Sequence, residues 1–376
     1  MKSLTWGQVN LWRLSQQCLS RRLQREDFLQ AVRQPIGIHA QLMSAAELAI
    51  AARVDGLSPQ DVQSALWQER SLVKTWMMRQ TLHLVPAADF PLFIAARRIT
   101  DINWPKIFDR EGINRATFDA YMAVSSEILN SEPMTRQQFT QAVDERLNSP
   151  ELHTFLVNGS WGTVFKPLAW RGELCFGPGS GQNATFVSPR DWIGSWQEIE
   201  PEAALQQVAR RYLAVYGPAR VRNFQVWWWM SGMSAKKAFN SIADETEEVE
   251  VEGWRSIALK ATLEPMLEME PTGEVHLLPP FDVYTVGLAR GKDLERLIAL
   301  EQQKKVYRPQ GWVSAVVLVD GFIRGTWDHK VQGSKTKVSV NMFSSLASGT
   351  SEKVAAEAER LGQFLNTLIN LDFIQS

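Results

Sequence analysis

The chain has 376 residues and a formal net charge of -1, and its content of 45% hydrophobic and 22% charged residues excludes a disordered protein. Its longest apolar runs are too short to span a membrane, and its first residues lack the pattern of a secretory signal peptide. Two cysteines, Cys18 and Cys175, are too few for a disulfide framework, so we expect a cytoplasmic protein in which both pack as small hydrophobic side chains.

The first 115 residues combine helical and strand patterns. Three helical segments and then two strands are expected at residues 8–32, 44–54, 58–66, 72–78 and 81–85. Ser44 and Glu47 have the spacing of a capping box, and Ser58-Pro59 places a proline at the first position of the next helix. Helix–helix–helix–hairpin is the order of a winged helix, a helix-turn-helix variant whose hairpin forms the wing.

The same order recurs twice further along the chain. The second unit is expected to have helices at residues 117–129, 136–147 and 153–157 and a hairpin within 174–187. The third is expected to have helices at residues 201–216, 219–230 and 234–242 and strands at 249–251 and 257–259. Thr135 is placed to cap one of these helices, and Gly217-Pro218 to stop another. Three successive matches of similar length predict tandem winged helices.

The C-terminal part of the chain has a different pattern. Strands are expected at residues 275–286, 312–319, 322–327 and 337–343, followed by a closing amphipathic helix at 352–371. The predicted fold class is therefore α+β. The expected domains are winged helices at residues 1–115, 116–200 and 201–274, then a β-barrel-like module with the closing helix at 275–376. We find neither a zinc-ligand pattern nor a glycine-rich phosphate loop, so we expect no metal and no cofactor.

Positive charge is concentrated in two parts of the sequence. Residues 1–110 contain 14 Lys and Arg against 9 Asp and Glu, residues 286–340 contain 10 against 5, and residues 241–275 contain 2 against 10. Because only local charge acts within a Debye length of about 8–10 Å, the small net charge does not exclude a nucleic-acid partner. Lys335 and Lys337 are expected near a hairpin tip, either as phosphate contacts or as part of a solvated loop.

Five stretches of the chain match a known family in their order and spacing. They are residues 37–41, 75–85, 216–219, 277–284 and 319–327. Together they resemble the AlkZ-type, or YcaQ-type, winged-helix DNA glycosylases across nearly the whole chain. The resemblance implies three tandem winged helices and a β-barrel-like module, curved into a C-shaped monomer around double-stranded DNA.

The resemblance also implies an activity and a catalytic motif. The activity is hydrolysis of the N-glycosidic bond of N3- or N7-alkylated purines in base excision repair, including bulky adducts and interstrand cross-links. The family signature is Gln-x-Gln, or Gln-x-Asp in another branch, and its two positions fall on His39 and Gln41. Histidine therefore replaces the first glutamine. No motif indicates a lysine that forms a Schiff base, so we expect a monofunctional glycosylase that leaves an abasic site.

The spacing of His39 and Gln41 suits an extended segment, in which side chains two residues apart lie on the same side. Pro35 and Gly37 precede the pair and the helix expected at residue 44 follows it, so we expect both side chains to point at one spot. Gln41 can hold a water with its carbonyl oxygen and direct that dipole at the positive charge that develops on the sugar. This suffices when the leaving group is a cationic alkylated purine. The alternative role for Gln41 is to cap the backbone.

His39 has two possible chemical roles. Because an unperturbed histidine has a pKa of about 6.5, the neutral ring can accept a proton from the attacking water, or the imidazolium can contact phosphate. Its structural alternative is a histidine whose hydrogen bonds are satisfied within the fold.

Three further residues are candidates for DNA contact. Thr81 and His83 alternate along an expected strand and therefore share one face, and Arg79 lies at the preceding turn. Thr81 and His83 either line the DNA channel or have a structural role, in which His83 donates to a backbone carbonyl inside the fold. Arg79 can reach a phosphate.

Two other functions compete with the enzyme hypothesis. A winged-helix transcription regulator is expected to dimerise and to place basic recognition helices in major grooves. The segment at residues 220–229 is more apolar than such a helix should be, and three fused units suit a monomeric clamp better. A protein that only senses damage is the second alternative.

Overall fold

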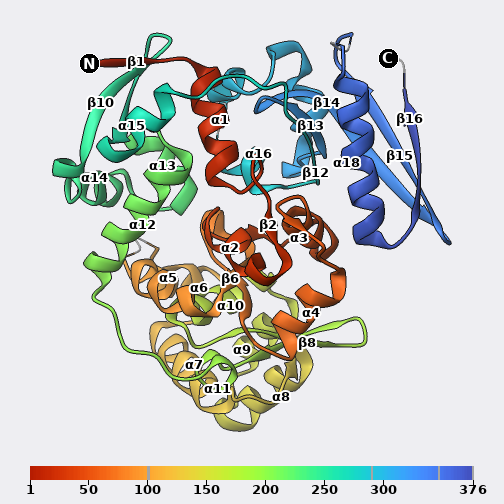
Figure 1. Ribbon diagram of the computed structural model, residues 1–376. Coiled ribbons are helices and arrows are strands. Elements are labelled where there is room, and N and C mark those ends of the chain that lie inside the picture. Colours follow the sequence, from red (N-terminus) through yellow and green to blue (C-terminus); the bar gives the residue numbers. More distant parts are fainter. Residues whose placement is uncertain (100–101, 289–290, 346–347, 375–376) are drawn as a thin grey trace.

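The computed structural model describes residues 1–99, 102–288, 291–345 and 348–374. It is a mixed helix and strand structure whose described residues form three sheets of three strands, one of five and one of two. In Figure 1 the five-stranded sheet lies at the right beside α18 (Thr350–Leu365), and the N-terminal strand β1 (Lys2–Leu4) lies at the upper left. The two ends of the described chain therefore belong to different sheets.

The first three-stranded sheet contains the Gly37–Gln41 stretch and has the antiparallel order β3-β6-β5. Its strands and the surrounding helices are β3 (Ile38–His39), β5 (Leu72–Trp76), β6 (Leu82–Pro86), α2 (Phe28–Arg33), α3 (Met43–Ala51), α4 (Pro59–Trp67) and α5 (Phe90–Arg97). The two-stranded sheet, β2 (Leu23–Gln24) with β4 (Val54–Asp55), lies in the same part of the chain. Ser58 and Asp61 form a capping box at the start of α4, so the helix expected there is confirmed.

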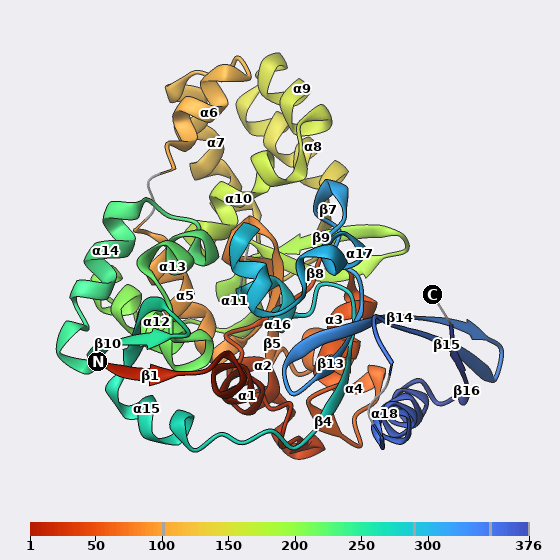
Figure 2. The ribbon, with the colours of Figure 1, turned by 90° about the horizontal axis from the view of Figure 1, so that it is seen from above.

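The second three-stranded sheet has the order β7-β9-β8. Its elements are α6 (Trp104–Arg110), α7 (Arg115–Ile128), β7 (Met134–Thr135), α8 (Arg136–Leu147), α9 (Pro150–Asn158), α10 (Trp161–Arg171), β8 (Cys175–Ser180), β9 (Asn183–Val187) and α11 (Pro189–Ile193). Seen from above, α6 to α9 lie together at one end of the molecule (Figure 2). The predicted Thr135 cap is confirmed by a capping box with Gln138, and the turn of the expected hairpin lies at Gly181.

The third three-stranded sheet joins the N-terminus to residues far along the chain, in the order β1-β10-β11. Its other elements are α1 (Trp6–Gln16), α12 (Pro201–Tyr216), α13 (Val221–Trp228), α14 (Gly232–Asn240), β10 (Thr246–Val251), β11 (Trp254–Leu259) and α15 (Lys260–Leu267). The buried Arg13 of α1 donates to the backbone carbonyls of Tyr216 and Pro218, just where α12 ends at Gly217. The first residues of the chain thus pack with the helices and strands of residues 201–267, and sequence periodicity does not reveal this contact.

The five-stranded sheet has the order β12-β13-β14-β15-β16. Its elements are β12 (Val275–Leu278), α16 (Val283–Leu288), α17 (Gln303–Val306), β13 (Val316–Val319), β14 (Phe322–Gln332), β15 (Lys335–Met342), α18 and β16 (Leu368–Phe373). The described residues also form short 3-10 helices at Arg25–Asp27, η2 (Met78–Gln80), Ala87–Asp89, Ala243–Glu245, Gly291–Arg296, Leu300–Gln302 and η7 (Pro309–Gly311). Within the described ranges β12 and β16 are edge strands that do not pair with each other, so the sheet is open and the β-barrel-like closure expected from the sequence is wrong.

Four expectations about local structure are corrected. The expected cap at Ser44 is wrong, because α3 already begins at Met43 with Leu42 as its N-cap. The helical segment at residues 8–32 is broken after α1, where Cys18 has a left-handed φ of 57°. The strand expected through residue 286 ends at Leu278, and α16 follows. The closing helix ends at Leu365, and the residues after it form β16, parallel to β15.

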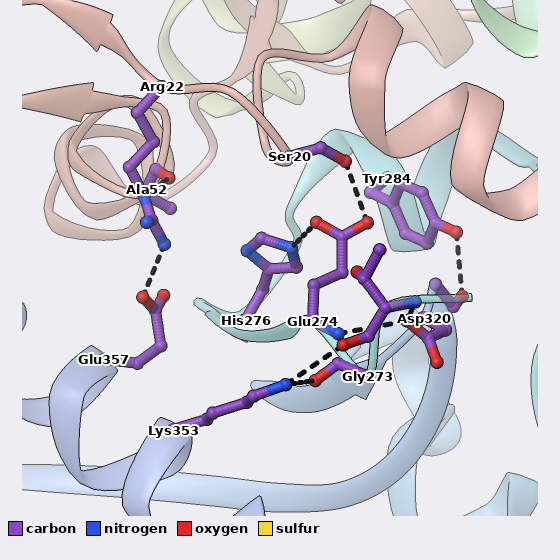
Figure 3. A network of polar contacts seen from close by, with 12 residues as sticks. Ser20, Arg22, Ala52, Gly273, Glu274, His276, Tyr284, Asp320, Lys353 and Glu357 are labelled. Atoms are coloured by element: carbon purple, nitrogen blue, oxygen red, sulfur yellow. Dashed lines mark hydrogen bonds and ion pairs between the residues drawn. The ribbon is translucent and has the colours of Figure 1, made fainter. Parts of the chain in front are cut away.

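Polar contacts attach the five-stranded sheet to the loop after α1 (Figure 3). Glu274 accepts hydrogen bonds from the Ser20 hydroxyl at 2.9 Å and from His276 Nε2 at 3.0 Å. On the neighbouring face, Arg22 forms an ion pair with Glu357 of α18 at 2.5 Å and donates to the Ala52 carbonyl. The Ser20–Glu274 and Arg22–Glu357 contacts join residues more than 250 positions apart. They hold the C-terminal sheet next to the loop after α1. Both cysteines are buried and free, as expected.

Candidate active site

A tight turn before β3 places the Gly37–Gln41 stretch at the edge of the first sheet. Ile36 and Gly37 have positive φ angles of 63° and 94°, and a Cβ on Gly37 would lie 3.1 Å from the Leu84 carbonyl oxygen. Glycine therefore allows both the turn and the close approach of β3 to β6. His39 pairs with His83, and the Ala40 amide donates to the Leu82 carbonyl at 2.7 Å. The extended conformation expected for His39 and Ala40 is confirmed.

His39 lies in an aromatic pocket and is only 7% exposed. The Phe281 ring stacks on it with a centroid distance of 5.3 Å and an interplanar angle of 19°. The His83 ring meets it edge-on at 5.4 Å. Its Nδ1 is buried and makes no hydrogen bond with a described residue. Burial, assisted by the positive charge of Arg79, lowers the pKa of His39 to about 3, so the ring is neutral at neutral pH.

His83 differs from His39 because both of its ring nitrogens are used. Its Nδ1 donates to the Thr81 carbonyl at 3.0 Å, and its Nε2 lies 3.2 Å from Arg79 Nη2, which can only donate. Burial and the charge of Arg79 hold the pKa of His83 well below its ordinary value. The structure thus brings Arg79, Thr81 and His83 together behind His39, with His83 fixed as a neutral ring.

Gln41 follows the last paired residue of this segment and is exposed. It lies in a bend between Ala40, whose side chain is buried, and the start of α3 at Met43. His39 is therefore covered by aromatic rings, whereas Gln41 is open to a ligand. An exposed amide two residues after a buried neutral imidazole offers hydrogen-bonding groups of both kinds without a charge.

Two sets of buried contacts hold the site in place and were not predicted from the sequence. Asp282 and Arg53 are completely buried and form a bidentate ion pair at 2.7 and 2.8 Å, next to Phe281 in the chain. Phe281 itself has a left-handed φ of 60°. Buried Arg97 donates to the carbonyls of Met77 at 3.0 Å and Trp228 at 2.6 Å, which ties the turn that carries Arg79 to α13. In three of these four hydrogen bonds the partners are 131 or more positions apart, so local patterns give no signal for them.

The remaining candidates lie elsewhere. Lys335 and Lys337 are exposed on β15, near the tip of the hairpin with β14, in a different sheet from His39. The predicted hairpin is confirmed, and Lys337 forms an ion pair with Asp372 at 3.2 Å. In the parts of the chain that the structure describes, no group of three or more His, Cys, Asp or Glu side chains is arranged to hold a metal ion. Every described helix is too short or too polar to traverse a lipid bilayer.

Comparison with known proteins identifies related chains. A family model described as DNA glycosylase AlkZ-like matches residues 32–364. A relative from Streptomyces sahachiroi, described as an interstrand DNA cross-link repair glycosylase, is 33% identical over 333 residues, which is 86% of this chain and 88% of the relative. The solved structure of Streptomyces sahachiroi DNA glycosylase AlkZ is 30% identical, with a TM-score of 0.88 over 100% of both chains.

Proposed function

Since the chain belongs to the AlkZ-like DNA glycosylase family, we propose that it hydrolyses the N-glycosidic bond of N3- or N7-alkylated purines in double-stranded DNA and leaves an abasic site. The observation that carries this proposal is that the two motif positions are a buried neutral His39 in an edge strand of the first sheet and an exposed Gln41 two residues later. Neither side chain has a charge at neutral pH, which fits a reaction whose leaving group is already cationic.

Gln41 is the proposed water-positioning residue. Its side-chain oxygen accepts a hydrogen bond from the attacking water and directs a negative dipole at the sugar as positive charge develops there. An alkylated purine leaves as a neutral base without prior protonation, so no strong acid is required. Gln41 is exposed and follows directly on the paired segment, so a nucleotide can reach it while the backbone that carries it stays fixed.

His39 acts as a hydrogen-bonding group rather than as a general base in this proposal. A base with a pKa of about 3 takes up a proton from water only weakly, because efficient bases have pKa values near the working pH. The stack with Phe281 and the edge contact with His83 hold the ring in one orientation. The sequence suggests two roles for His39, a proton acceptor for water or an imidazolium that contacts phosphate. Its low pKa favours neither role. We assign His39 to orienting the water or the substrate.

The Streptomyces sahachiroi relative is described as an interstrand DNA cross-link repair glycosylase, so we extend the proposal to interstrand cross-links and, with them, to bulky adducts. We infer that this chain also acts on them, as a monomeric cytoplasmic enzyme of base excision repair that needs no metal or cofactor. The three three-stranded sheets, each with its own helices, support the assignment of three winged helices. Their C-shaped arrangement around DNA is proposed from the family resemblance. Arg79, Lys335 and Lys337 are proposed phosphate contacts, and Thr81 is proposed to line the DNA channel. His83 is completely buried and both of its ring nitrogens are hydrogen-bonded within the fold, so we assign it the structural role instead.

A regulator that binds DNA through α13 is disfavoured by the packing of that helix. Phe224, Trp227 and Trp228 are all buried in the largest core cluster of the described residues. A recognition helix needs an exposed face rich in polar side chains to meet base edges. These three aromatic side chains therefore serve the core, which agrees with a segment more apolar than a recognition helix should be.

The proposal is tested by incubating the protein with three duplexes that carry N7-methylguanine, N3-methyladenine or a nitrogen-mustard cross-link. Free modified base and alkali-labile strands are measured, with the Gln41→Ala variant as the inactive control. We expect release from at least one duplex and at least a hundredfold slower release by the variant. No release above the control on any lesion, from a protein that still binds DNA, would exclude the enzyme.

A further inference from the structure

One exposed tryptophan is connected to the proposed active site through ring contacts. Trp312 is 40% exposed, and its indole ring offers a large rigid surface on which a nucleobase can stack. Its ring meets Phe281 edge-on, with a centroid distance of 5.0 Å and an interplanar angle of 75°. Phe281 in turn stacks on His39. Trp312 is therefore only two ring contacts away from the proposed water-orienting residue.

The backbone around Trp312 is held in a closed turn. The Arg308 amide donates to the Trp312 carbonyl at 2.9 Å, and Tyr307 forms an isolated bridge with Val313. At the base of the turn the Tyr307 hydroxyl donates to the Thr285 carbonyl at 3.1 Å, while the Phe281 amide faces the Val313 carbonyl at 3.3 Å. The exposed ring is thus presented from a fixed loop, at little cost in ordering on binding.

The same loop is positively charged. Lys304, Lys305 and Arg308 are exposed, and the segment 303–312 contains no aspartate or glutamate. It lies within the part of the sequence, residues 286–340, that has a surplus of basic residues. Exposed cations around an exposed aromatic ring are the combination that binds single-stranded or opened nucleic acid, by phosphate contact and base stacking.

We propose that residues 304–312 form a DNA-binding loop in which Trp312 stacks on a nucleobase next to the damaged nucleotide, while the three exposed cations contact phosphates. The inference rests on the proposed function, because it places damaged DNA at His39 and Gln41. The stacked base covers the exposed part of the Trp312 ring. Phe281 contacts both Trp312 and His39 and so lies between the DNA-binding ring and the catalytic motif. Trp312 is a binding residue, separate from the catalytic motif.

A binding experiment tests the stacking. The probe is a duplex with a tetrahydrofuran abasic-site analogue, which resembles the reaction product and cannot be cleaved by a glycosylase. Trp312→Leu is expected to weaken its binding by about tenfold, the equivalent of one lost base–aromatic stack, and Trp312→Phe by much less. Trp161→Leu is the matched control, because Trp161 is 39% exposed in another group of the fold. Equal affinity of Trp312→Leu and the parent overturns the proposal.

Photocrosslinking locates the contact directly. With 5-iodouracil next to the abasic-site analogue, irradiation is expected to join the DNA to Trp312, as mapped by mass spectrometry. A cross-link only at other residues overturns the proposal, as does weaker catalysis by Trp312→Leu with unchanged binding, because that pattern shows a packing role alone. If the proposed function fails at the level of DNA binding, the parent protein itself shows no affinity for the probe, so the two failures are distinguishable.

The basic residues of the loop are tested separately by the salt dependence of DNA binding. Replacing Lys304, Lys305 and Arg308 by alanine is expected to reduce the dependence of log Kd on log salt concentration by about 0.9 for each lost phosphate contact. Trp312→Leu should leave that slope unchanged, since stacking releases no counterions. A triple variant with the parent slope would show that the loop does not contact phosphates.

Discussion

His39 differs from an ordinary histidine because burial suppresses its charge. A group with a pKa of about 3 does not change its protonation state across the range in which enzymes usually work. Its neighbour His83 is neutral as well, and its ring is oriented by hydrogen bonds to the Thr81 carbonyl and Arg79. We therefore propose that the two rings and Gln41 act through dipoles and that neither ring needs to carry a charge.

The pH dependence of the reaction rate shows whether His39 changes its protonation state. Between pH 5 and 8, the single-turnover rate of the parent should show no inflection that belongs to His39, and the His39→Gln variant should have a profile of the same shape. His39→Gln should remain active at a reduced rate, because glutamine also donates and accepts hydrogen bonds. An inflection near pH 6.5 in the parent that is lost in the variant would show that His39 titrates during the reaction.

The second residue-scale prediction concerns Gly37. An alanine at this position has to adopt a φ of 94° and also crowds the Leu84 carbonyl oxygen. We expect Gly37→Ala to reduce the free energy of unfolding by about 1–2 kcal/mol from the left-handed backbone alone, and by more because of the crowding. Gly56→Ala separates the two effects, since Gly56 has a φ of 71° with nothing within 4 Å of its Cβ position. Equal losses in urea unfolding would contradict the argument for a close approach of β3 to β6.

At the scale of elements, the segment between β12 and α16 is held against the first sheet by a buried ion pair. Arg53, just after α3, meets Asp282, and neither side chain is exposed. The pair lies beside Phe281, so it fixes the ring that stacks on His39. Buried ion pairs are no reliable source of net stability, but removing one partner leaves an uncompensated charge.

We therefore predict that Asp282→Ala lowers the free energy of unfolding by about 3–5 kcal/mol. The exposed pair Arg115–Asp119, one turn apart on α7, is the control, and Asp119→Ala should cost less than about 1 kcal/mol. Chemical unfolding of both variants measures the contrast. Comparable losses would show that the buried pair has no special role in holding Phe281 in place.

At the scale of the whole molecule, the sequence predicts most of the elements but not how distant parts join. Local signals sufficed where a cap or a stop lies next to the element, as at Thr135, Ser58 and Gly217. They failed for residues 368–373, which have the apolar spacing of a helix but pair with β15. Such pairing depends on a partner strand about 30 residues away, and tertiary context then overrides local propensity.

In the candidate site, too, the local features were predicted from the sequence and the long-range contacts were not. His39 and Gln41 were found from the family motif, and the extended backbone followed from Pro35 and Gly37. Phe281, which stacks on His39, and Trp312, which contacts Phe281, lie more than 240 positions away from His39 in the chain. No periodicity connects these positions, so their contribution could not be derived before the fold was known.

The attachment of the C-terminal sheet gives a prediction at this scale. Burial raises the pKa of Glu274, but hydrogen bonds from His276 and Ser20 outweigh that effect, and the pKa lies below its ordinary value of 4.5. A lowered carboxyl pKa contributes stability that is present above about pH 4.5 and is lost as the pH falls through the folded-state value. Glu274→Gln should therefore be less stable than the parent at pH 7, and the difference should shrink near pH 4. Urea unfolding at both pH values checks this, and a difference that does not depend on pH would contradict it.

The central claim is that this chain excises alkylated purines with an uncharged His39–Gln41 pair. The most direct measurement is the single-turnover release of 7-methylguanine from an N7-methylguanine duplex at saturating enzyme, for the parent and for Gln41→Ala. DNA binding by both proteins is measured in parallel with an abasic-site analogue. We predict free 7-methylguanine and an abasic strand from the parent, and at least hundredfold slower release by the variant with similar DNA affinity. Equal release rates for the two proteins would contradict the assignment of the site.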